Sequence, residues 1–172
     1  KTLPAEYNLC PVEDLVILIA YMLSEVVQVN DQRTVGSNVY TRFHSRFPPN
    51  IPIIDYLHRI VKYVSLTPPL LLSVVFYMDR LCFLYPDFIL SSLTVHRFLI
   101  TAATIASKGL SDFCWPHEIY AYVGGVGNSE LSLLERDFLY RLHWGILPNP
   151  HKLADCYRDL VERAETYMIE AE

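Results

Sequence analysis

The chain has 172 residues and a formal net charge of −5, with 52% hydrophobic and 19% charged residues. This length suggests a single domain, and the composition is too apolar and too weakly charged for a disordered segment. Because nucleic-acid-binding proteins usually carry a basic surface, the acidic balance argues against DNA or RNA as the main ligand. The most apolar run, Leu15 to Leu23, is far shorter than the roughly 20 residues of a membrane span, so we expect no membrane partner.

Prolines and glycines separate a series of segments whose apolar residues recur at helical spacing. The first, 12–29, carries Leu15, Ile19 and Met22 on one face, and it is followed by a polar linker at 30–50 with at most one short helix. Further helices are predicted at 52–63, 68–84, 92–108, 116–122, 128–143 and 150–169. No stretch shows the sustained alternation of a strand, so the predicted fold class is all-α.

One of these segments, 92–108, is rich in Ala, Ser and Thr. Small side chains let neighbouring helices approach closely. We therefore expect this helix to lie at the centre of a helical bundle.

Motifs for catalysis or metal binding are missing from the sequence. Cys114 and His117 are three residues apart, but no second pair of ligands follows, so we expect no metal and no cofactor, and a solvated His117. The glycines at 124–127 lack the ending of a phosphate loop and predict a turn between two helices. We expect four reduced thiols in an intracellular protein. They are Cys10, Cys82, Cys114 and Cys156. These features favour a binding or regulatory module over an enzyme.

Two charged residues lie beside apolar positions. Lys108 ends the small-residue helix, and Glu135 shares a helical face with Leu131 and Leu139. A carboxylate on an apolar stripe is costly to bury without a partner. Periodicity alone favours either a solvated Glu135 at the edge of the stripe or an internal pair with Lys108.

Three sequence blocks, in this order, resemble the cyclin box. They are YMDR at 77–80, FLITAATIASK at 98–108 and LLERDFLYRLHW at 133–144. More narrowly, IIDYLHRIVKY, LTVHRFLITA and YVGGVGNSELSLLERDFL resemble the phosphate-signalling (PHO-type) cyclins, which have one cyclin box. The resemblance implies a five-helix cyclin box at 49–147. It also implies an N-terminal helix and linker at 1–48 and a C-terminal helix at 148–172 that packs on the box.

The resemblance also implies a function. A cyclin is the regulatory subunit of a cyclin-dependent protein kinase, has no catalysis of its own, and activates the kinase by docking the kinase's helix C. It acts inside the cell, in the nucleus, the cytoplasm or both. Carried over to this chain, the family's polar kinase-binding residues are Lys108 and Glu135, and the resemblance favours this role for them over an internal pair. The expected hydrophobic kinase contacts are Leu110, Leu139, Trp144 and Ile146.

The chain departs from better-known cyclins at the motif that recruits RxL-type substrates. The motif MRAIL would fall at 49–53, where the sequence reads PNIPI, so recruitment of RxL-type substrates is in doubt. The arginine of MRAIL usually pairs with the aspartate of the YIDR-like motif. Asp79 therefore needs another partner, for which Arg59, Arg97 or a backbone N–H are the candidates.

A second departure follows Lys108. The family often has a kinase-contacting Phe at the next position, whereas this chain has Gly109. Leu110 or Phe113 is the expected substitute.

An alternative function remains open at this stage. Some members of the cyclin fold are scaffolds that bind peptide segments of other proteins without a kinase. In that case Lys108 and Glu135 would be dispensable, and another groove would carry the function.

Overall fold

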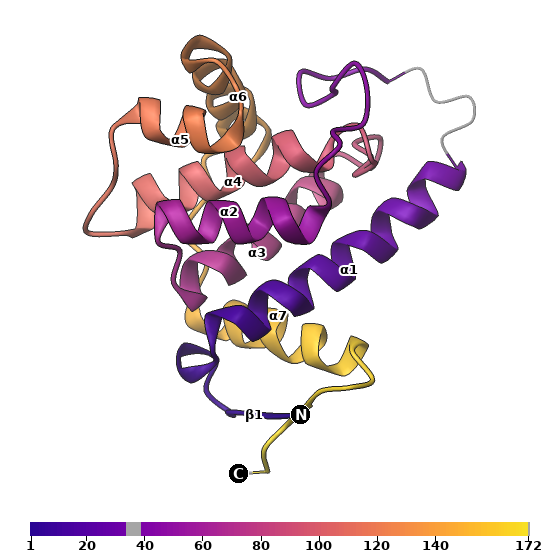
Figure 1. The fold of residues 1–172 in the computed structure, drawn as a ribbon, viewed down its shortest axis with the longest axis vertical. Coiled ribbons are helices and arrows are strands. Elements are labelled where there is room, and N and C mark those ends of the chain that lie inside the picture. Colours follow the sequence, from indigo (N-terminus) through magenta and orange to yellow (C-terminus); the bar gives the residue numbers. More distant parts are fainter. Residues whose placement is uncertain (34–38, 172) are drawn as a thin grey trace.

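The computed structural model describes residues 1–33 and 39–171. Within them the chain forms seven α-helices, one 3-10 turn at Tyr7–Leu9 and two short strands (Figure 1). The helices are α1 (Val12–Arg33), α2 (Ile53–Val64), α3 (Pro68–Leu84), α4 (Val95–Leu110), α5 (His117–Gly124), α6 (Asn128–Arg141) and α7 (Pro150–Arg163). The strands are β1 (Thr2–Leu3) and β2 (Met168–Ile169). The predicted all-α class is confirmed.

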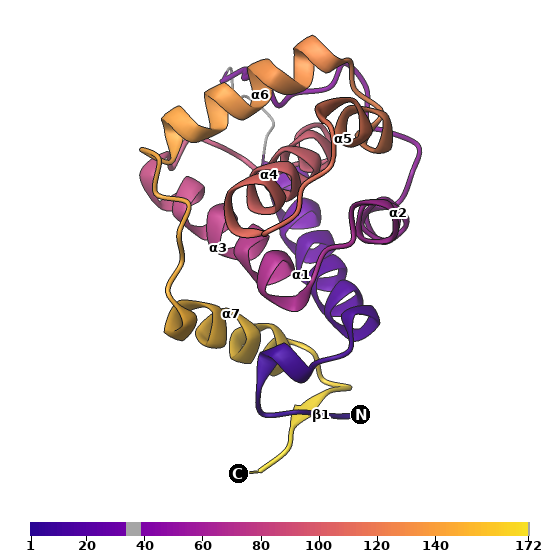
Figure 2. The same ribbon diagram turned by 90° about the vertical axis from the view of Figure 1, so that its left-hand side faces the viewer.

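Helix α4 lies at the centre of the bundle, as its small residues predict. Figure 2 shows it nearly end-on, surrounded by α2, α3, α5 and α6, all of which contact it. Every residue from Phe98 to Ser107 is buried. The hydroxyls of Thr101 and Thr104 donate hydrogen bonds to carbonyls one turn earlier in the same helix, at 2.6 and 2.7 Å. The hydroxyls of Thr101 and Thr104 are therefore satisfied inside the core.

Helices α1 and α7 lie close to the two ends of the chain (Figure 1). Helix α1 packs against α2, α3 and α7, and α7 packs against α3. Beyond them, β1 and β2 pair in parallel, with Leu3 opposite Ile169. The buried carboxylate of Asp14 accepts hydrogen bonds from Lys1 Nζ at 2.7 Å and from the Tyr167 hydroxyl at 3.2 Å. These contacts fix the C-terminal segment against the start of α1.

The predicted last helix is too long. It was expected to reach Ile169, but α7 ends at Arg163, after which Ala164 has an extended backbone. The reason lies in tertiary contacts, because residues 168–169 form backbone hydrogen bonds with the N-terminal strand instead of continuing the helix. The apolar pattern of one helix does not show that a strand from the other end of the chain will bind its last residues.

The predicted linker, 30–50, begins with the last residues of α1, at 30–33, and its residues 39–50 form turns, bends and irregular backbone without a helix. The linker residues 34–38 lie outside the described residues.

Two helix boundaries differ from the predicted ones. Helix α1 extends four residues past its predicted end, and α4 begins three residues after its predicted start because Thr94 closes a turn before it. The Thr94 hydroxyl donates to the Ile89 carbonyl at 2.8 Å and accepts from the Ser91 amide at 2.8 Å.

The glycine-rich segment is the turn between helices that the sequence predicts. Gly125 ends α5 in the left-handed region, at φ = 70°. Gly124 lies where α5 crosses α4, and a Cβ atom there would overlap the side chain of Ile100. The missing side chain therefore allows the two helices to make close contact. Gly127, by contrast, has open space around its Cα atom.

Gly124→Ala is expected to lower the free energy of unfolding by about 1–3 kcal/mol, because the added methyl group forces α5 away from Ile100. The gain in helix propensity from Gly to Ala, about 1 kcal/mol at most, offsets part of this loss. Urea unfolding measures the effect. Gly127→Ala is the matched control and should cost less, about 0.5 kcal/mol, because there is open space around this residue and only its preference as the N-cap of α6 is lost. Equal stability of both variants would show that the two helices do not depend on the contact of Gly124 with Ile100.

Candidate functional site

The two charged residues singled out in the sequence form an ion pair across two helices. Lys108 lies at the end of α4 and Glu135 in the middle of α6, and Lys108 Nζ is 3.0 Å from Glu135 Oε1 and 3.3 Å from Oε2. The Glu135 side chain is 15% exposed and that of Lys108 32%. The pair is thus half-buried, with polar groups still accessible to a partner.

His117 completes this cluster, although the sequence predicted it to be solvated. Its Nε2 lies 2.8 Å from the Asn128 carbonyl oxygen, so Nε2 carries the proton, and its Nδ1 then accepts a hydrogen bond from Lys108 Nζ at 2.9 Å. The same Nδ1 is 3.5 Å from Glu135 Oε2. His117 therefore helps to hold the lysine ammonium group in place. Sequence spacing gave no signal for this contact, because it depends on how α5 and α6 pack against α4.

The loop that follows α6 carries two of the predicted hydrophobic contacts, Trp144 and Ile146. It is anchored by α3: the buried Tyr77 hydroxyl donates to the Ile146 carbonyl at 2.8 Å, and Arg80 Nε donates to the Leu142 carbonyl at 3.1 Å. Burial raises the pKa of the Tyr77 hydroxyl, so it remains a donor at physiological pH. The tyrosine and arginine of the YMDR block thus position the loop.

The backbone of this loop turns sharply. His143 and Trp144 adopt left-handed conformations, at φ = 52° and 59°, and the Trp144 amide donates to the Leu139 carbonyl at 2.9 Å. A Cβ atom on Gly145 would lie 2.7 Å from the guanidinium group of Arg80. The close approach of Arg80 therefore requires a glycine here. As a result the indole of Trp144 is held outward and is 68% exposed.

Gly109 also has a structural explanation. A Cβ atom at this position would lie 2.8 Å from Cδ1 of Ile146. The absence of a side chain thus lets Ile146 rest against the end of α4, next to Lys108. Of the two expected substitutes for the missing Phe, Leu110 is half-buried and packs on the core, whereas Phe113 is 64% exposed and stacks edge-on against Trp115.

These contacts bring most of the predicted site residues to one region. Lys108, Glu135 and Ile146 meet at the end of α4, and Leu139 and Trp144 are joined through the backbone bond described above. Leu110 is set apart, because it lines a groove with Leu70 and Leu153. A half-buried ion pair with exposed and half-exposed hydrophobic side chains is typical of a protein-binding surface.

The expected partners of Asp79 are wrong. Arg59 donates to the Tyr122 carbonyl at 3.3 Å, and Arg97 pairs with Glu130. The position of Asp79 in α3 instead directs its side chain towards α7, where Asp159 and Arg163 are the charged residues that influence it. The loss of the MRAIL arginine thus leaves this aspartate in a different environment.

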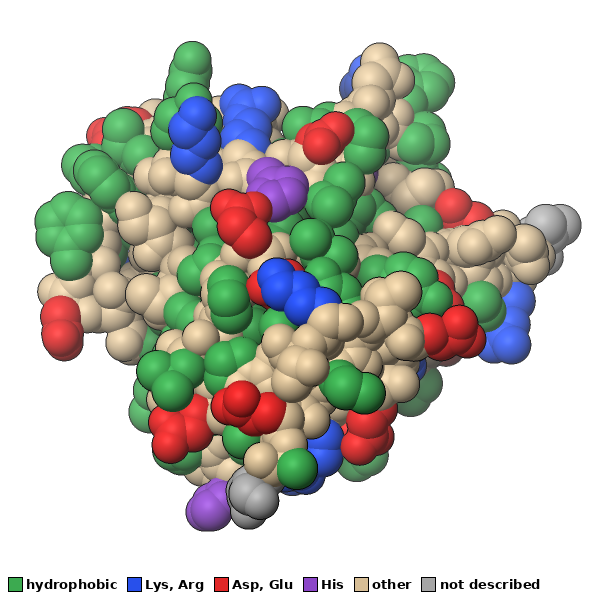
Figure 3. Space-filling model, turned by 60° about the horizontal axis from the view of Figure 1, so that its bottom comes forward, with side chains coloured by type: hydrophobic (Ala, Val, Ile, Leu, Met, Phe, Trp, Pro, Cys, Tyr) green, Lys and Arg blue, Asp and Glu red, His purple; other side chains and the backbone are tan. Residues whose placement is uncertain are grey.

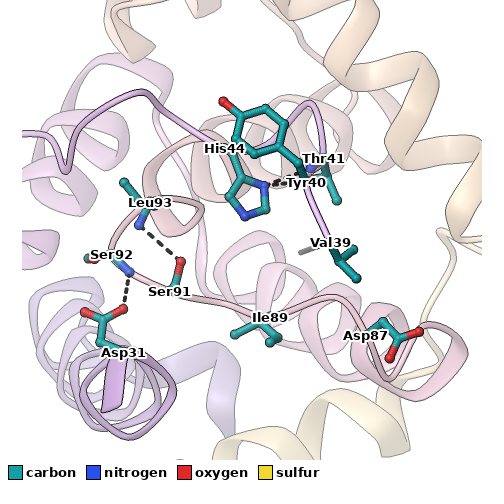
Figure 4. A pocket seen from close by; sticks show the side chains of 10 residues that line it. All are labelled: Asp31, Val39, Tyr40, Thr41, His44, Asp87, Ile89, Ser91, Ser92 and Leu93. Carbon is teal, nitrogen blue, oxygen red and sulfur yellow. Dashed lines mark hydrogen bonds between the residues drawn. The ribbon is translucent and has the colours of Figure 1, made fainter. Parts of the chain in front are cut away.

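A pocket near the end of α1 does not have the chemistry of an active site. It has a volume of about 640 Å³ and lies between the end of α1, residues 39–44 and the loop before α4 (Figure 4). Its polar side chains bind nearby backbone: Asp31 accepts from the Ser92 amide at 3.0 Å, Ser91 from the Leu93 amide at 3.2 Å, and His44 from the Thr41 amide at 2.9 Å. These bonds hold the surrounding loops together.

Other kinds of site are also missing from the part of the chain that the structure describes. No three His, Cys, Asp or Glu side chains there are grouped as a metal ion would require. Over the same residues, every helix is too short or too polar to cross a membrane. All four cysteines are free thiols, as the sequence predicts.

Comparison with known proteins identifies the family. The family model described as Cyclin matches residues 13–146. The chain belongs to the cyclin family. Cyclins are regulatory proteins and not enzymes. This family membership confirms the regulatory class that the resemblance implied.

The similar curated proteins place this cyclin among the PHO-type members. The Nuc-1 negative regulatory protein preg of Neurospora crassa is 53% identical over 173 residues, which cover 99% of this chain and 36% of the relative. The PHO85 cyclin PHO80 of Saccharomyces cerevisiae is 44% identical over 158 residues, or 90% of this chain and 54% of the relative. Cyclin-U4-1 of Arabidopsis thaliana is 34% identical and covers 78% of this chain and 69% of the relative. The chain therefore spans about a third to a half of the length of the first two relatives.

Tyr77→Phe removes the donor that anchors the loop after α6 of this cyclin. Because the Ile146 carbonyl would lose its partner, we expect a loss of about 1 kcal/mol in the free energy of unfolding and faster amide hydrogen exchange at 142–147. Urea unfolding and exchange mass spectrometry measure the two effects. Tyr63→Phe, which changes an exposed tyrosine in the same way, is the control. Unchanged exchange in the Tyr77 variant would contradict the anchoring role.

Proposed function

We propose that this cyclin binds a cyclin-dependent protein kinase and activates it by docking the kinase's helix C. The observation that carries this proposal is the half-buried pair of Lys108 and Glu135 beside the apolar surface of Leu139 and Ile146. Hydrophobic side chains supply the buried area of an interface, and charged groups fix the orientation of the partner. Both are available here within one surface.

The arrangement suits the recognition of a helix. Lys108 can donate to carbonyl groups of the kinase backbone, and Glu135 can accept from its N–H groups, while Leu139, Trp144 and Ile146 contact the apolar face of helix C. His117 supports this by holding the Lys108 ammonium group, and the anchored loop presents Trp144 and Ile146 with little loss of conformational entropy on binding.

Activation follows from differential binding. A kinase needs a glutamate of its helix C to pair with its ATP-binding lysine before it can transfer a phosphoryl group. A cyclin that binds the inward position of helix C better than the outward one shifts the kinase population to the active form. The cyclin contributes no catalytic group to the reaction.

The names of the relatives suggest the kind of kinase. The yeast relative is named as a cyclin of PHO85, and we propose a kinase of that class as the partner. Phosphate signalling is the process that membership in this class suggests. Residence in the nucleus, the cytoplasm or both stays a prediction.

Glu135→Ala is expected to weaken kinase binding by about 2 kcal/mol or more, which is roughly thirtyfold or more in Kd. Its effect on the free energy of unfolding should be about 1 kcal/mol or less, because the ion pair is partly exposed. Calorimetric titration with the purified kinase and urea unfolding separate the two effects. Arg136→Ala, a change on the next and exposed residue of α6, is the control. Normal binding combined with a large loss of stability would mean that Glu135 is structural.

Leu139→Asp tests the hydrophobic part of the surface. A charge placed in the centre of the interface should abolish the complex and the kinase activity that depends on it. Tyr140→Asp adds the same charge at an exposed neighbour and should leave the complex intact. If the Leu139 variant folds and still activates the kinase, the docking surface lies elsewhere. The scaffold alternative would then gain support, since it requires neither Leu139 nor the ion pair.

A further inference from the structure

His117 contacts both members of the Lys108–Glu135 pair with one ring nitrogen. Its Nδ1 lies 2.9 Å from Lys108 Nζ and 3.5 Å from Glu135 Oε2. The side chain is 26% exposed, so it can exchange protons with the solvent. Histidine is the side chain that most readily changes its charge between pH 5 and 8. A change of charge on this ring therefore acts directly on the surface that is proposed to bind the kinase.

The other ring nitrogen fixes where a second proton can be added. Nε2 of His117 lies 2.8 Å from the Asn128 carbonyl oxygen and 3.1 Å from Ser132 Oγ. The Ser132 hydroxyl donates to the same carbonyl at 3.2 Å. Because a carbonyl oxygen only accepts, Nε2 carries a proton in both charge states of the ring. The second proton can be added only at Nδ1, which is the nitrogen that faces Lys108 and Glu135.

The neutral ring holds the lysine in place. Lys108 Nζ donates to His117 Nδ1 and, at 3.0 Å, to Glu135 Oε1, and it lies 5.6 Å from the centre of the Tyr120 ring. A carboxylate has about four acceptor positions, so Glu135 can still accept from a partner while it binds Lys108. In this state both charged groups are oriented before the kinase arrives.

The protonated ring changes these contacts. Nδ1 then carries a proton and cannot accept from Lys108, and two positive groups at this distance repel each other. The same proton points towards the Glu135 carboxylate, which lies within ion-pair distance. Glu135 therefore exchanges Lys108 for His117 as its closest partner, and the lysine ammonium group loses the position that the kinase requires.

The charged groups around His117 come from three helices. Helix α4 contributes Lys108 and α6 contributes Glu135, and no other carboxylate among the described residues lies within 4 Å of a His117 nitrogen. The groups of α6 at Nε2 are uncharged. His117 is the first residue of α5, whose N-terminal N–H groups carry partial positive charge. Lys108 and this helix end oppose the added proton, whereas Glu135 favours it.

A second contact between a histidine and a carboxylate supplies a comparison. His58 Nδ1 lies 3.4 Å from Glu13 Oε2, between α2 and α1 and away from the proposed docking surface. On the face of the molecule shown in Figure 3, acidic and basic side chains are likewise scattered among hydrophobic ones. Charge alone therefore does not distinguish His117. Its distinction is the contact with a lysine and a glutamate that are both proposed to bind the kinase.

We propose that His117 is a positioning residue whose charge state regulates the docking surface. The neutral ring holds Lys108 in the orientation that binds the kinase, and the protonated ring pairs with Glu135 and weakens the complex. This inference rests on the proposed function, because it requires that the kinase binds Lys108 and Glu135. By linkage, the bound kinase must hold His117 neutral, so the ring takes up its proton at a lower pH in the complex than in the free chain.

The test compares the unchanged chain with His117→Gln. A glutamine amide can donate to the Asn128 carbonyl and accept from Lys108, as the neutral ring does, but it does not titrate. The dissociation constant of a purified kinase of the PHO85 class is measured from pH 7.5 to pH 5.5. At pH 7.5 both chains should bind within about twofold of each other, and at pH 5.5 the unchanged chain should bind about tenfold more weakly than the variant. Titrating groups of the kinase affect both chains alike, so the ratio isolates His117.

Two further histidines serve as matched controls. His58→Gln removes the other histidine that contacts a carboxylate, and His143→Asn removes an exposed histidine next to Trp144. Asparagine tolerates the left-handed backbone of residue 143. Both variants should keep the pH dependence of the unchanged chain. The inference is overturned if the unchanged chain and His117→Gln have the same pH profile, or if the unchanged chain binds more tightly at pH 5.5.

Nuclear magnetic resonance of the chain without a kinase tests the contact itself. The ring Cε1–H signal of His117 and the Cε signal of Lys108 should change with a common midpoint between pH 5 and 8, and the step at Lys108 should vanish in His117→Gln. Without a common step the inference fails, even if the kinase binds normally. If the common step is present but the kinase binds neither chain at any pH, the proposed function fails and the regulation with it.

Discussion

The packing of α2, α3, α5 and α6 around α4 is the constraint on which the other features depend. Four helices can contact one central helix because many of its side chains are small. The hydroxyls of Thr101 and Thr104 find partners within the helix, so they can be buried there. Gly124 extends the same principle to the crossing of α4 and α5. Because this packing fixes where α4 ends, it also fixes the position of Lys108.

The proposed kinase-docking surface is built from groups that the core places at the end of α4. Glu135 on α6 and His117 on α5 reach Lys108 because both helices pack on α4. Helix α3 supports this surface, because the Tyr77 hydroxyl and the Arg80 guanidinium group donate hydrogen bonds to the loop after α6. Within the YMDR block, Tyr77 and Arg80 thus position the loop, whereas Asp79 faces Asp159 and Arg163 of α7.

The loop after α6 lies between two parts of the surface. It presents Trp144 and Ile146 beside the ion pair of Lys108 and Glu135, an arrangement that suits the burial of a helix. The next residue, Leu147, is 76% exposed and lies beside α3 and α7. The anchoring of this loop by α3 therefore determines which of its hydrophobic side chains lie near Lys108 and Glu135.

The sequence by itself determined the helical class, the boundaries of α3 and the central position of α4. Helical spacing reports which side chains are buried, and small residues report where helices meet, so these features can be read locally. The residues of the proposed kinase-docking surface came from the resemblance to cyclins. Only the tertiary structure decided the end of α7, the contact of His117 with Lys108 and the surroundings of Asp79. Each of these depends on how separate segments pack: β2 against β1, α5 against α4, and α3 against α7. The periodicity of a single segment does not record which distant segment will compete for its hydrogen bonds or its charge.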